Sequence, residues 1–269
     1  MSQKTYSPYG IISERLKRIY SELEKVPIDK SLLYQLYGCI SLADGVENHL
    51  EESTSPESEN LSNLSRLTFE HDWDLALEKK KSSGFLGSQM LCGHVEGQFL
   101  KMLVTITKAK KILELGMFSG YSALAMAESL PKGGEIYACE HNPYAIKFAQ
   151  KIFKKIQENR IKIKNGPALE TLKKLTCKDI IFDLVFIDAT KSQYPEYLEI
   201  LIKNSLINKN SLVCIDNTFL QGKVFSKLEN TNDSSKIMRK FNLNIARNPK
   251  FHAVMLPLRD GFTLLKLNK

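Results

Sequence analysis

The feature that most constrains the fold of this chain is a regular alternation of short apolar segments with helical patterns after Met90. Each apolar segment is aliphatic or β-branched and is followed by a turn signal, so each is predicted to be a strand. These segments are KILEL (111–115), EIYACE (135–140), RIKIK (160–164), DLVFID (183–188) and SLVCID (211–216). Strands that alternate with helices predict a parallel sheet with helices on both faces.

The end of the chain departs from this alternation. Residues 251–267, FHAVMLPLRDGFTLLKL, contain two strand patterns around a turn at Asp260–Gly261. A short turn of this kind between two strands predicts an antiparallel hairpin. We therefore predict an α/β fold whose sheet has seven strands, is mostly parallel, and finishes in this hairpin.

The segment before the alternation is predicted to be helical. Apolar residues recur at helical spacing over residues 11–43, and Pro27 separates two helices there. The polar run EESTSPESEN (51–60) predicts a loop, and SNLSRLTFEH (62–71) predicts the beginning of another helix.

A change of composition predicts the domain boundary. The run KKKSSGFLGSQ (79–89) is rich in lysine, serine and glycine, and it separates a helical extension (1–85) from a catalytic domain (86–269). A chain of 269 residues is near the upper limit for a single core.

The chain is basic, with a formal net charge of +8. Its lysines are spread through KAKK, KFAQKIFKK and LKKL, which fit solvated helix faces better than a nucleic-acid site. The first residues lack a long apolar segment, so no signal peptide is predicted. No apolar run is long enough to span a membrane, and we predict a cytoplasmic protein without a membrane partner.

The cysteines agree with that compartment. None pairs at C-x-x-C spacing, which argues against a zinc finger or a redox motif. An odd number of unpaired cysteines is typical of reduced thiols in the cytosol. They are Cys39, Cys92, Cys139, Cys177 and Cys214.

A glycine loop follows the first predicted strand. Ligands of open parallel sheets bind at the carboxyl ends of the strands, and LELGMFSGYS places Glu114, Gly116 and Gly120 at such an end. The dinucleotide fingerprint G-x-G-x-x-G is absent, which disfavours an NAD-dependent oxidoreductase. A carboxylate before the loop instead suits a cationic ligand, such as the amino group of S-adenosylmethionine. The alternative is a tight turn in which Ser119 caps the next helix.

Carboxylates also end the other strands. Glu140 ends the second strand, where it can accept hydrogen bonds from two ribose hydroxyls. Asp188 ends the fourth strand, and Asp216 and Asn217 end the fifth. Two carboxylates and one amide oxygen form a set of hard ligands that suits Mg²⁺ or Ca²⁺. The alternative is a helix cap at the first site and an Asx turn at the second.

A lysine stands close to these carboxylates. Lys191 lies three residues after Asp188. An exposed lysine is a poor base at neutral pH, but a nearby cation lowers the pKa of the ammonium. Lys191 could then accept a proton from an acceptor hydroxyl. The alternative is a surface lysine with no role.

At this point the chain resembles a known family, the cation-dependent class I O-methyltransferases of the caffeoyl-CoA and catechol type. The runs that carry the resemblance begin near Met90 and continue to the end of the chain in the order of the family. GVENHLEESTSPESENLSNLSRLT also resembles its N-terminal helical region, so that about the first 44 residues are extra. The matching runs are EGQFLKML, ILELGMFSGYSALAMAESLP, GPALETL, FIDATKSQYPEY, DNTFLQGKV and LPLRDGFTLL.

The resemblance implies a Rossmann-like methyltransferase fold and a role for each matching residue. Asp188, Asp216 and Asn217 match metal ligands for Mg²⁺, with Ca²⁺ or Mn²⁺ as alternatives. Lys191 matches the catalytic base, and it acts together with Asp188. The implied contacts of S-adenosylmethionine are Cys92, Glu114, Gly116, Met117, Ser122, Glu140, Ala168, Asp188 and Tyr197.

Two positions depart from the pattern of the family. Thr190 replaces an aspartate that usually helps to bind the cofactor, so that contact is weakened or supplied by another group. Leu220 stands where many members have tryptophan, so stacking against the acceptor is expected to differ. We expect the helical extension and the loop after Asn217 to build the acceptor pocket.

The family also implies an acceptor and an assembly. Several short runs, among them MLCGHVEGQ and ACEHNPYA, look most like the branch that acts in mycosporine biosynthesis, where a cyclic enol is methylated on the way to 4-deoxygadusol. We therefore predict a small vicinal enediol or catechol-like acceptor and a homodimer. Two alternatives stay open: methylation of a wobble hydroxyuridine in tRNA, and binding of a nucleoside without chemistry.

Overall fold

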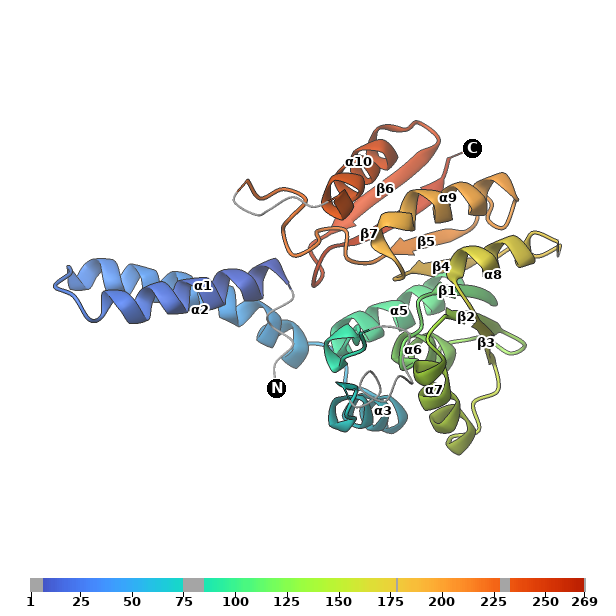
Figure 1. The fold of residues 1–269 in the computed structure, drawn as a ribbon, viewed down its shortest axis with the longest axis horizontal. Helices are drawn as coiled ribbons and strands as arrows, with labels where there is room; N and C mark the ends of the chain where they lie inside the picture. The colour runs from blue at the N-terminus through green and yellow to red at the C-terminus, as the bar shows by residue number, and fades with distance from the viewer. Residues whose placement is uncertain (1–6, 75–84, 178, 228–232, 269) are drawn as a thin grey trace.

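The structure is a computed structural model, and it describes residues 7–74, 85–177, 179–227 and 233–268. A single seven-stranded sheet forms its centre, in the order β3-β2-β1-β4-β5-β7-β6 (Figure 1). The first five strands are parallel, and β7 runs antiparallel to both of its neighbours. The strands are β1 (Lys111–Leu115), β2 (Glu135–Glu140), β3 (Ile161–Asn165), β4 (Leu184–Ile187), β5 (Leu212–Ile215), β6 (Phe251–Leu256) and β7 (Phe262–Leu267).

These strands confirm the predicted sheet, because every predicted strand is present and the parallel ones end within one residue of their predicted ends. The pattern succeeded because the central strands are buried on both faces, which makes them continuous apolar runs. Both β4 and β5 are buried at every residue.

Helices cover both faces of the sheet. Alternate strand residues point to opposite faces, so Ile112 and Leu113 of β1 belong to two different cores. The core that contains Ile112 packs against α3 (Glu59–Glu70), α5 (His94–Thr107), α6 (Tyr121–Glu128) and α7 (Pro143–Lys155). The core that contains Leu113 packs against α8 (Ala168–Leu175), α9 (Tyr194–Lys203) and α10 (Asp233–Arg247).

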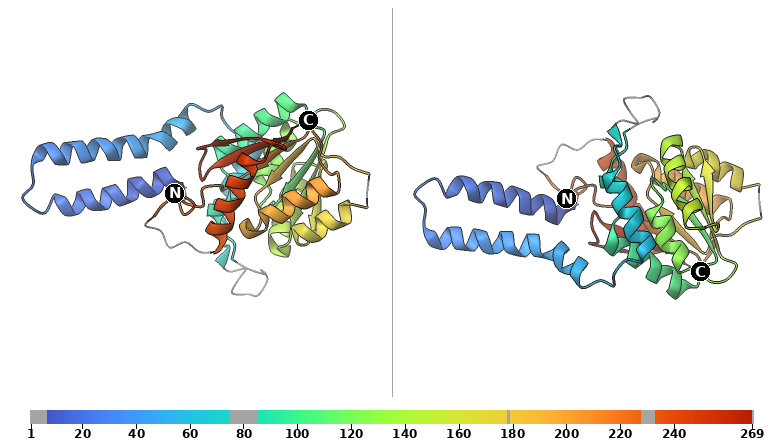
Figure 2. Two further views of the ribbon diagram at one scale, coloured as in Figure 1. Left: turned by 90° about the horizontal axis from the view of Figure 1, so that it is seen from above. Right: turned by 90° about the horizontal axis from the view of Figure 1, so that it is seen from below.

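The first two helices form an antiparallel hairpin that projects from this body (Figures 1 and 2). They are α1 (Pro8–Leu23) and α2 (Lys30–Glu52), and the break between them contains Pro27, as predicted. Ser7 and Asp29 cap the two helices through their side chains. Within the described residues, no helix is both long enough and apolar enough to span a membrane.

One local prediction was wrong, and the alternative in which Ser119 caps a helix does not hold either. The loop predicted for residues 51–60 is shorter, because α2 continues to Glu52 and Ser58 caps α3, accepting a hydrogen bond from the Leu61 amide. Ser119 does not cap α6, because Gly120 holds the N-cap position without a side-chain bond.

The domain boundary stays a prediction. Residues 79–84 of the predicted boundary run lie outside the described residues. Leu61 and Leu64 of α3 are fully buried in the core of the body, so this part of the predicted extension packs with the sheet domain.

Candidate active site

A cavity of about 780 Å³ opens where the parallel strands end. It gathers most of the residues that the sequence singled out. Glu114 and Gly120 do not line the cavity, and Glu114 lies fully buried behind Ser122. The predicted residues that line it are Cys92, Gly116, Met117, Ser122, Glu140, Ala168, Asp188, Lys191, Tyr197, Asp216 and Asn217.

The loop after β1 requires its first glycine. Gly116 has φ of +95°, and a Cβ atom there would lie 2.2 Å from the carbonyl oxygen of Asp188. Any other residue would therefore force the loop after β1 away from the end of β4. The amides of Gly116 and Met117 both donate to the Cys139 carbonyl at 3.1 Å, which fixes this loop against the end of β2.

Among the carboxyl groups predicted to bind the cofactor, that of Glu114 has the largest pKa shift. The Ser122 hydroxyl donates to its Oε1, while its Oε2 is buried without a partner among the described residues. Burial raises the pKa of Glu114 to about 8, although the Ser122 bond opposes this shift. A buried carboxyl with a free oxygen is suited to receive a cationic donor.

Glu140 is held in a different way at the end of β2. Its Oε2 accepts from the Phe118 amide at 2.8 Å, and its Oε1 accepts from the amides of His141 and Asn142 at 2.8 Å each. These bonds fix the carboxylate at the cavity wall, where it can still accept further hydrogen bonds.

Asp188 and Asp216 follow neighbouring strands directly. Ile187 and Ile215 pair in the β4–β5 ladder, so the two aspartates leave the sheet side by side. Burial and the charge of Asp188 raise the pKa of Asp216 to about 7. Asn217 adds an amide and has a left-handed backbone, with φ of +56°.

This donor set fits a hard divalent cation. Two carboxylates and an amide oxygen are all oxygen ligands, and the raised pKa of Asp216 reflects negative charge that a cation would offset. Among the described residues, no group of three or more His, Cys, Asp or Glu side chains is arranged to hold a metal ion. The third oxygen of the predicted set is the side-chain amide of Asn217.

Lys191 pairs directly with Asp188, its Nζ donating to Oδ1. Burial alone lowers the pKa of Lys191, but the charges of Asp188, Tyr194 and Asp216 outweigh it and raise the pKa above its ordinary value. The lowered pKa expected from the sequence depends on a neighbouring cation, so the lysine is a protonated partner of Asp188 here. The side chain of Lys191 is 28% exposed and lines the cavity, so its role stays a prediction.

Two residues that sequence reasoning missed lie beside this group. Arg259 Nη1 donates to the Leu91 carbonyl at 3.0 Å and lies 3.4 Å from Glu96 Oε2. Glu96 is fully buried, and burial together with the charge of Asp216 raises its pKa well above the usual value. The two residues are far apart in the chain, and the only sequence signal was their place in the runs EGQFLKML and LPLRDGFTLL.

The walls of the cavity come from the segments that were expected to build the acceptor pocket. Tyr9 of α1 and Val46 and Leu50 of α2 line one side. Leu220 and Gln221 line another, and both have left-handed backbones, with φ of 47° and 57°. Left-handed residues other than glycine are uncommon and concentrate at functional sites.

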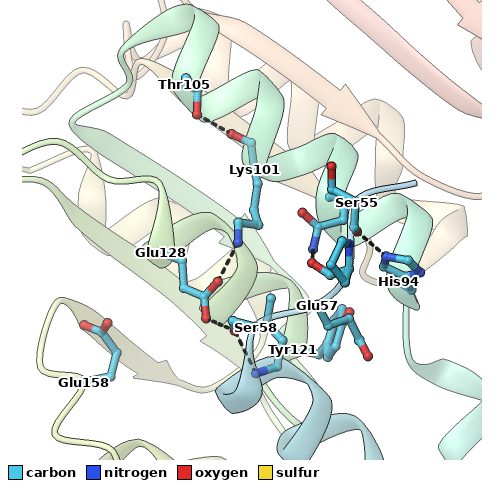
Figure 3. Close-up of polar contacts among 12 residues, drawn as sticks. Ser55, Glu57, Ser58, His94, Lys101, Thr105, Tyr121, Glu128 and Glu158 are labelled. Atoms are coloured by element: carbon cyan, nitrogen blue, oxygen red, sulfur yellow. Dashed lines mark hydrogen bonds and ion pairs between the residues drawn. The ribbon is translucent and has the colours of Figure 1, made fainter. Parts of the chain in front are cut away.

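A polar network fixes the segment between α2 and α3 against α5 and α6 (Figure 3). His94 Nε2 lies 2.6 Å from the Ser55 carbonyl oxygen, and the Tyr121 hydroxyl donates to Glu57. Lys101 Nζ donates to Glu128 at 2.6 Å. Since His94 and Tyr121 also line the cavity, this network connects the helical region to the site.

Comparisons with known proteins show the family to which the chain is similar. The profile of a family described as O-methyltransferase matches residues 51–268. The O-methyltransferase ankF of Aspergillus thermomutatus is 32% identical over 196 residues, which cover 68% of this chain and 81% of that protein. Caffeoyl-CoA O-methyltransferase 2 of Populus trichocarpa is 31% identical over 233 residues, which cover 81% and 85%.

Solved structures show the same fold. The SAH-bound methyltransferase PaMTH1 of Podospora anserina superposes with a TM-score of 0.73 at 25% identity, over 91% of this chain and 98% of that one. An O-methyltransferase of Bacillus cereus in complex with SAH gives a TM-score of 0.67 at 25% identity, over 83% and 97%.

Proposed function

The chain belongs to the O-methyltransferase family, and from this premise we propose that it moves a methyl group from S-adenosylmethionine to one hydroxyl of a small vicinal enediol or catechol-like acceptor, with the help of a divalent cation. The observation that carries the proposal is one cavity that joins a cofactor half, around Gly116 and Glu140, to a set of oxygen ligands beside Lys191.

The cofactor half is suited to the two ends of S-adenosylmethionine. Ser122 lines the cavity and can present its hydroxyl to the cationic amino acid end, with the Glu114 carboxyl, which accepts the Ser122 hydrogen bond, directly behind it. Glu140, fixed by three amides, faces the ribose hydroxyls. Thr190 lacks the carboxylate that is usual at its position. The Tyr197 ring, held through its hydroxyl by Gln193 at 2.7 Å, remains to form that part of the wall.

Asp188, Asp216 and Asn217 would hold the cation. When bound, a Mg²⁺ ion supplies Lewis acidity that lowers the pKa of an acceptor hydroxyl. Lys191 is protonated in the cation-free site, so it must first release its ammonium proton to water. The charge of a cation held by Asp188 would favour that loss, and the neutral Nζ could then accept the hydroxyl proton. The acceptor oxygen forms a bond to the methyl carbon as the carbon–sulfur bond breaks, so the cavity contributes mainly by aligning the two reactants.

The predicted cation ligands indicate the chemical class of the acceptor. Two adjacent oxygens are what a divalent cation can bind while it keeps its protein ligands. Catechols and cyclic enediols both offer that pair, and the mycosporine-type runs favour a cyclic enol of the kind that leads to 4-deoxygadusol. The caffeoyl-CoA enzymes among the relatives favour a catechol.

A tRNA acceptor is less well supported. The described lining of the cavity carries six acidic side chains against three basic ones, and RNA phosphates need the opposite balance. The acidic residues are Glu47, Glu51, Glu140, Asp188, Asp216 and Asp260, and the basic ones are Lys191, Lys223 and Arg259.

A methyl-transfer assay with catechols and cyclic enols tests the proposal. We expect activity with Mg²⁺ and its loss in EDTA, and full activity in EDTA would contradict the role of the cation. Asp188→Asn should abolish cation-stimulated transfer. Asp183→Asn is the matched control, because Asp183 precedes the same strand at its other end, and its side chain accepts hydrogen bonds from the amides of Lys110 and Lys111.

A further inference from the structure

An arginine of the last hairpin lies in the wall of the cavity. Arg259 stands between β6 and β7 and lines the same cavity as Asp188 and Asp216, but the proposed reaction gives it no role. The Gly261 amide donates to the Leu258 carbonyl at 2.9 Å, so Arg259 is the first central residue of a four-residue turn. Its φ of +48° is a conformation that favours glycine, asparagine or aspartate at this position. The turn itself therefore does not explain a large charged side chain here.

The side chain of Arg259 is anchored through one nitrogen. Its Nη1 donates to the Leu91 carbonyl at 3.0 Å and lies 3.4 Å from Glu96 Oε2. A guanidinium has five N–H donors, and neither Nε nor Nη2 of Arg259 donates to another residue that the structure describes. The side chain is 23% exposed and lines the cavity. The pair formed by Nε and Nη2, which we call the free edge, is therefore open to a ligand there.

The contact with Glu96 does not account for the whole guanidinium. An arginine that neutralises a buried carboxylate commonly forms two parallel hydrogen bonds with both of its oxygens. Here Glu96 Oε1 is buried without a partner among the described residues, and Oε2 is 3.4 Å from a single nitrogen. Glu96 and the Leu91 carbonyl thus fix the orientation of the arginine and leave its free edge available.

The charges around Arg259 indicate the acceptor half of the cavity. Burial opposes charge at Arg259, but the negative charges of Glu96, Asp216 and Asp188 outweigh it and raise the pKa of the guanidinium above its ordinary value. Two of these three, Asp216 and Asp188, are predicted ligands of the cation. The groups that shift the pKa of Glu114, on the cofactor side, do not include Arg259. A charged arginine is therefore held close to the place where the acceptor oxygens would bind the cation.

The free edge is suited to a carboxylate. Two N–H groups in one plane match the two oxygens of a carboxylate, and this pairing is stronger than a neutral hydrogen bond. The described lining of the cavity is otherwise mostly acidic, which disfavours an anionic ligand except beside a fixed positive charge. Lys191 already pairs with Asp188, so Arg259 is better placed to receive such a ligand.

We propose that Arg259 binds a carboxylate of the methyl acceptor, so that the preferred acceptor is a vicinal diol that also carries an acid group. The inference rests on the proposed function, because the two vicinal oxygens would bind the cation at the other end of the molecule. The ionic contact is the same before and during methyl transfer. It should therefore lower KM for the acceptor and leave kcat nearly unchanged.

Pairs of catechols that differ only in charge test the proposal. The acid is attached to the ring directly or through one or two methylene groups, and each acid is compared with its neutral amide in the presence of S-adenosylmethionine and Mg²⁺. In steady-state kinetics of the full chain, we expect at least one acid to have a KM about 10–100-fold below that of its amide, at similar kcat.

Variants of Arg259 identify the group that causes this preference. Arg259→Gln should raise KM for the acid to that of the amide and leave KM for the amide nearly unchanged. Arg259→Lys keeps the charge but loses the planar pair of donors, so it should retain only part of the preference. Lys223→Gln is the matched control, because it removes another positive charge from the cavity wall, one whose Nζ donates to Gln221 at 3.0 Å. It should keep the preference of the wild type.

Calorimetry separates this inference from the proposed function. The affinities of the same pairs are measured with S-adenosylhomocysteine, which has no methyl group to transfer, so the preference is seen even if no acceptor is methylated. Absence of any methylated product would contradict the proposed function. Equal affinity of the wild type for every acid and its amide would overturn the role of Arg259, whether or not Arg259→Gln folds by circular dichroism.

Two results from the variants would also overturn the proposal. The first is an unchanged preference in Arg259→Gln, or a preference lost equally in Lys223→Gln, which would mean that the general field of the cavity selects the acid. The second is weaker binding of S-adenosylmethionine in Arg259→Gln with the preference for the acid intact, which would assign Arg259 to the cofactor.

Discussion

Strands β4 and β5 are buried at every residue, whereas the α1–α2 hairpin buries three residues over two long helices. The sheet domain is therefore stabilised by its own packing, which leaves it able to hold polar groups such as Glu114 and Asp216 in buried positions. The hairpin has no comparable interior. Buried polar groups therefore distinguish the first region, and exposed apolar side chains distinguish the second.

The largest expected difference concerns core leucines. Leu113→Ala removes a fully buried side chain from the sheet core and should lower the free energy of unfolding by about 2–5 kcal/mol. Leu36→Ala, at a half-buried position between α1 and α2, should cost about 1 kcal/mol or less in the monomer. Urea denaturation followed by circular dichroism measures both. Equal losses would show that the hairpin is as well packed as the body.

The next effect is on activity. Asp216→Asn should lower kcat by about 10²–10³-fold, since it removes a charge at the position where the acceptor is activated. Val46→Ala, at the hairpin side of the same cavity, should raise KM and change kcat little. Steady-state kinetics with saturating Mg²⁺ distinguishes the two. A large loss of kcat in Val46→Ala would place the hairpin in the chemistry itself.

A smaller effect is expected on cofactor affinity. Glu114→Gln keeps the size of the side chain but cannot ionise when a cationic group binds, so S-adenosylmethionine should bind about 10–100-fold more weakly by calorimetry. Ser122→Ala should have a smaller effect, because the carboxylate stays in place. Unchanged affinity in Glu114→Gln would exclude an ionic contact with the cofactor.

The same carboxyl predicts how stability depends on pH. The pKa of Glu114 is about 8 in the folded protein and near 4.3 when exposed, so the native state binds the extra proton between these values. The free energy of unfolding of the cofactor-free protein should therefore fall as pH rises from about 5 to 8, by an amount on the order of a few kcal/mol. Thermal unfolding across this range should show a shallower fall for Glu114→Gln. Identical slopes would mean that other groups cause the dependence.

The sequence was sufficient for the sheet and for much of the site. The central strands could be predicted because they are continuous apolar runs. Because ligands bind at the carboxyl ends of parallel strands, Glu140, Asp188 and Asp216 could be predicted as site residues. The contact between Arg259 and Glu96 could not be predicted from the sequence, because it joins a turn of the last hairpin to α5 across 163 residues. The burial of Glu114 behind Ser122 also depends on packing that periodicity does not reveal.

At Gly116 the loop after β1 lies directly against the backbone of Asp188 at the end of β4, so close that a Cβ atom there would be 2.2 Å from the Asp188 carbonyl oxygen. Gly116 has no side chain that could absorb a displacement at this contact. The loop that meets the cofactor and the residue that would hold the cation thus behave as one mechanical unit. Binding of the cofactor should therefore change the affinity for the cation. Binding of the cation should change the affinity for the cofactor by the same factor.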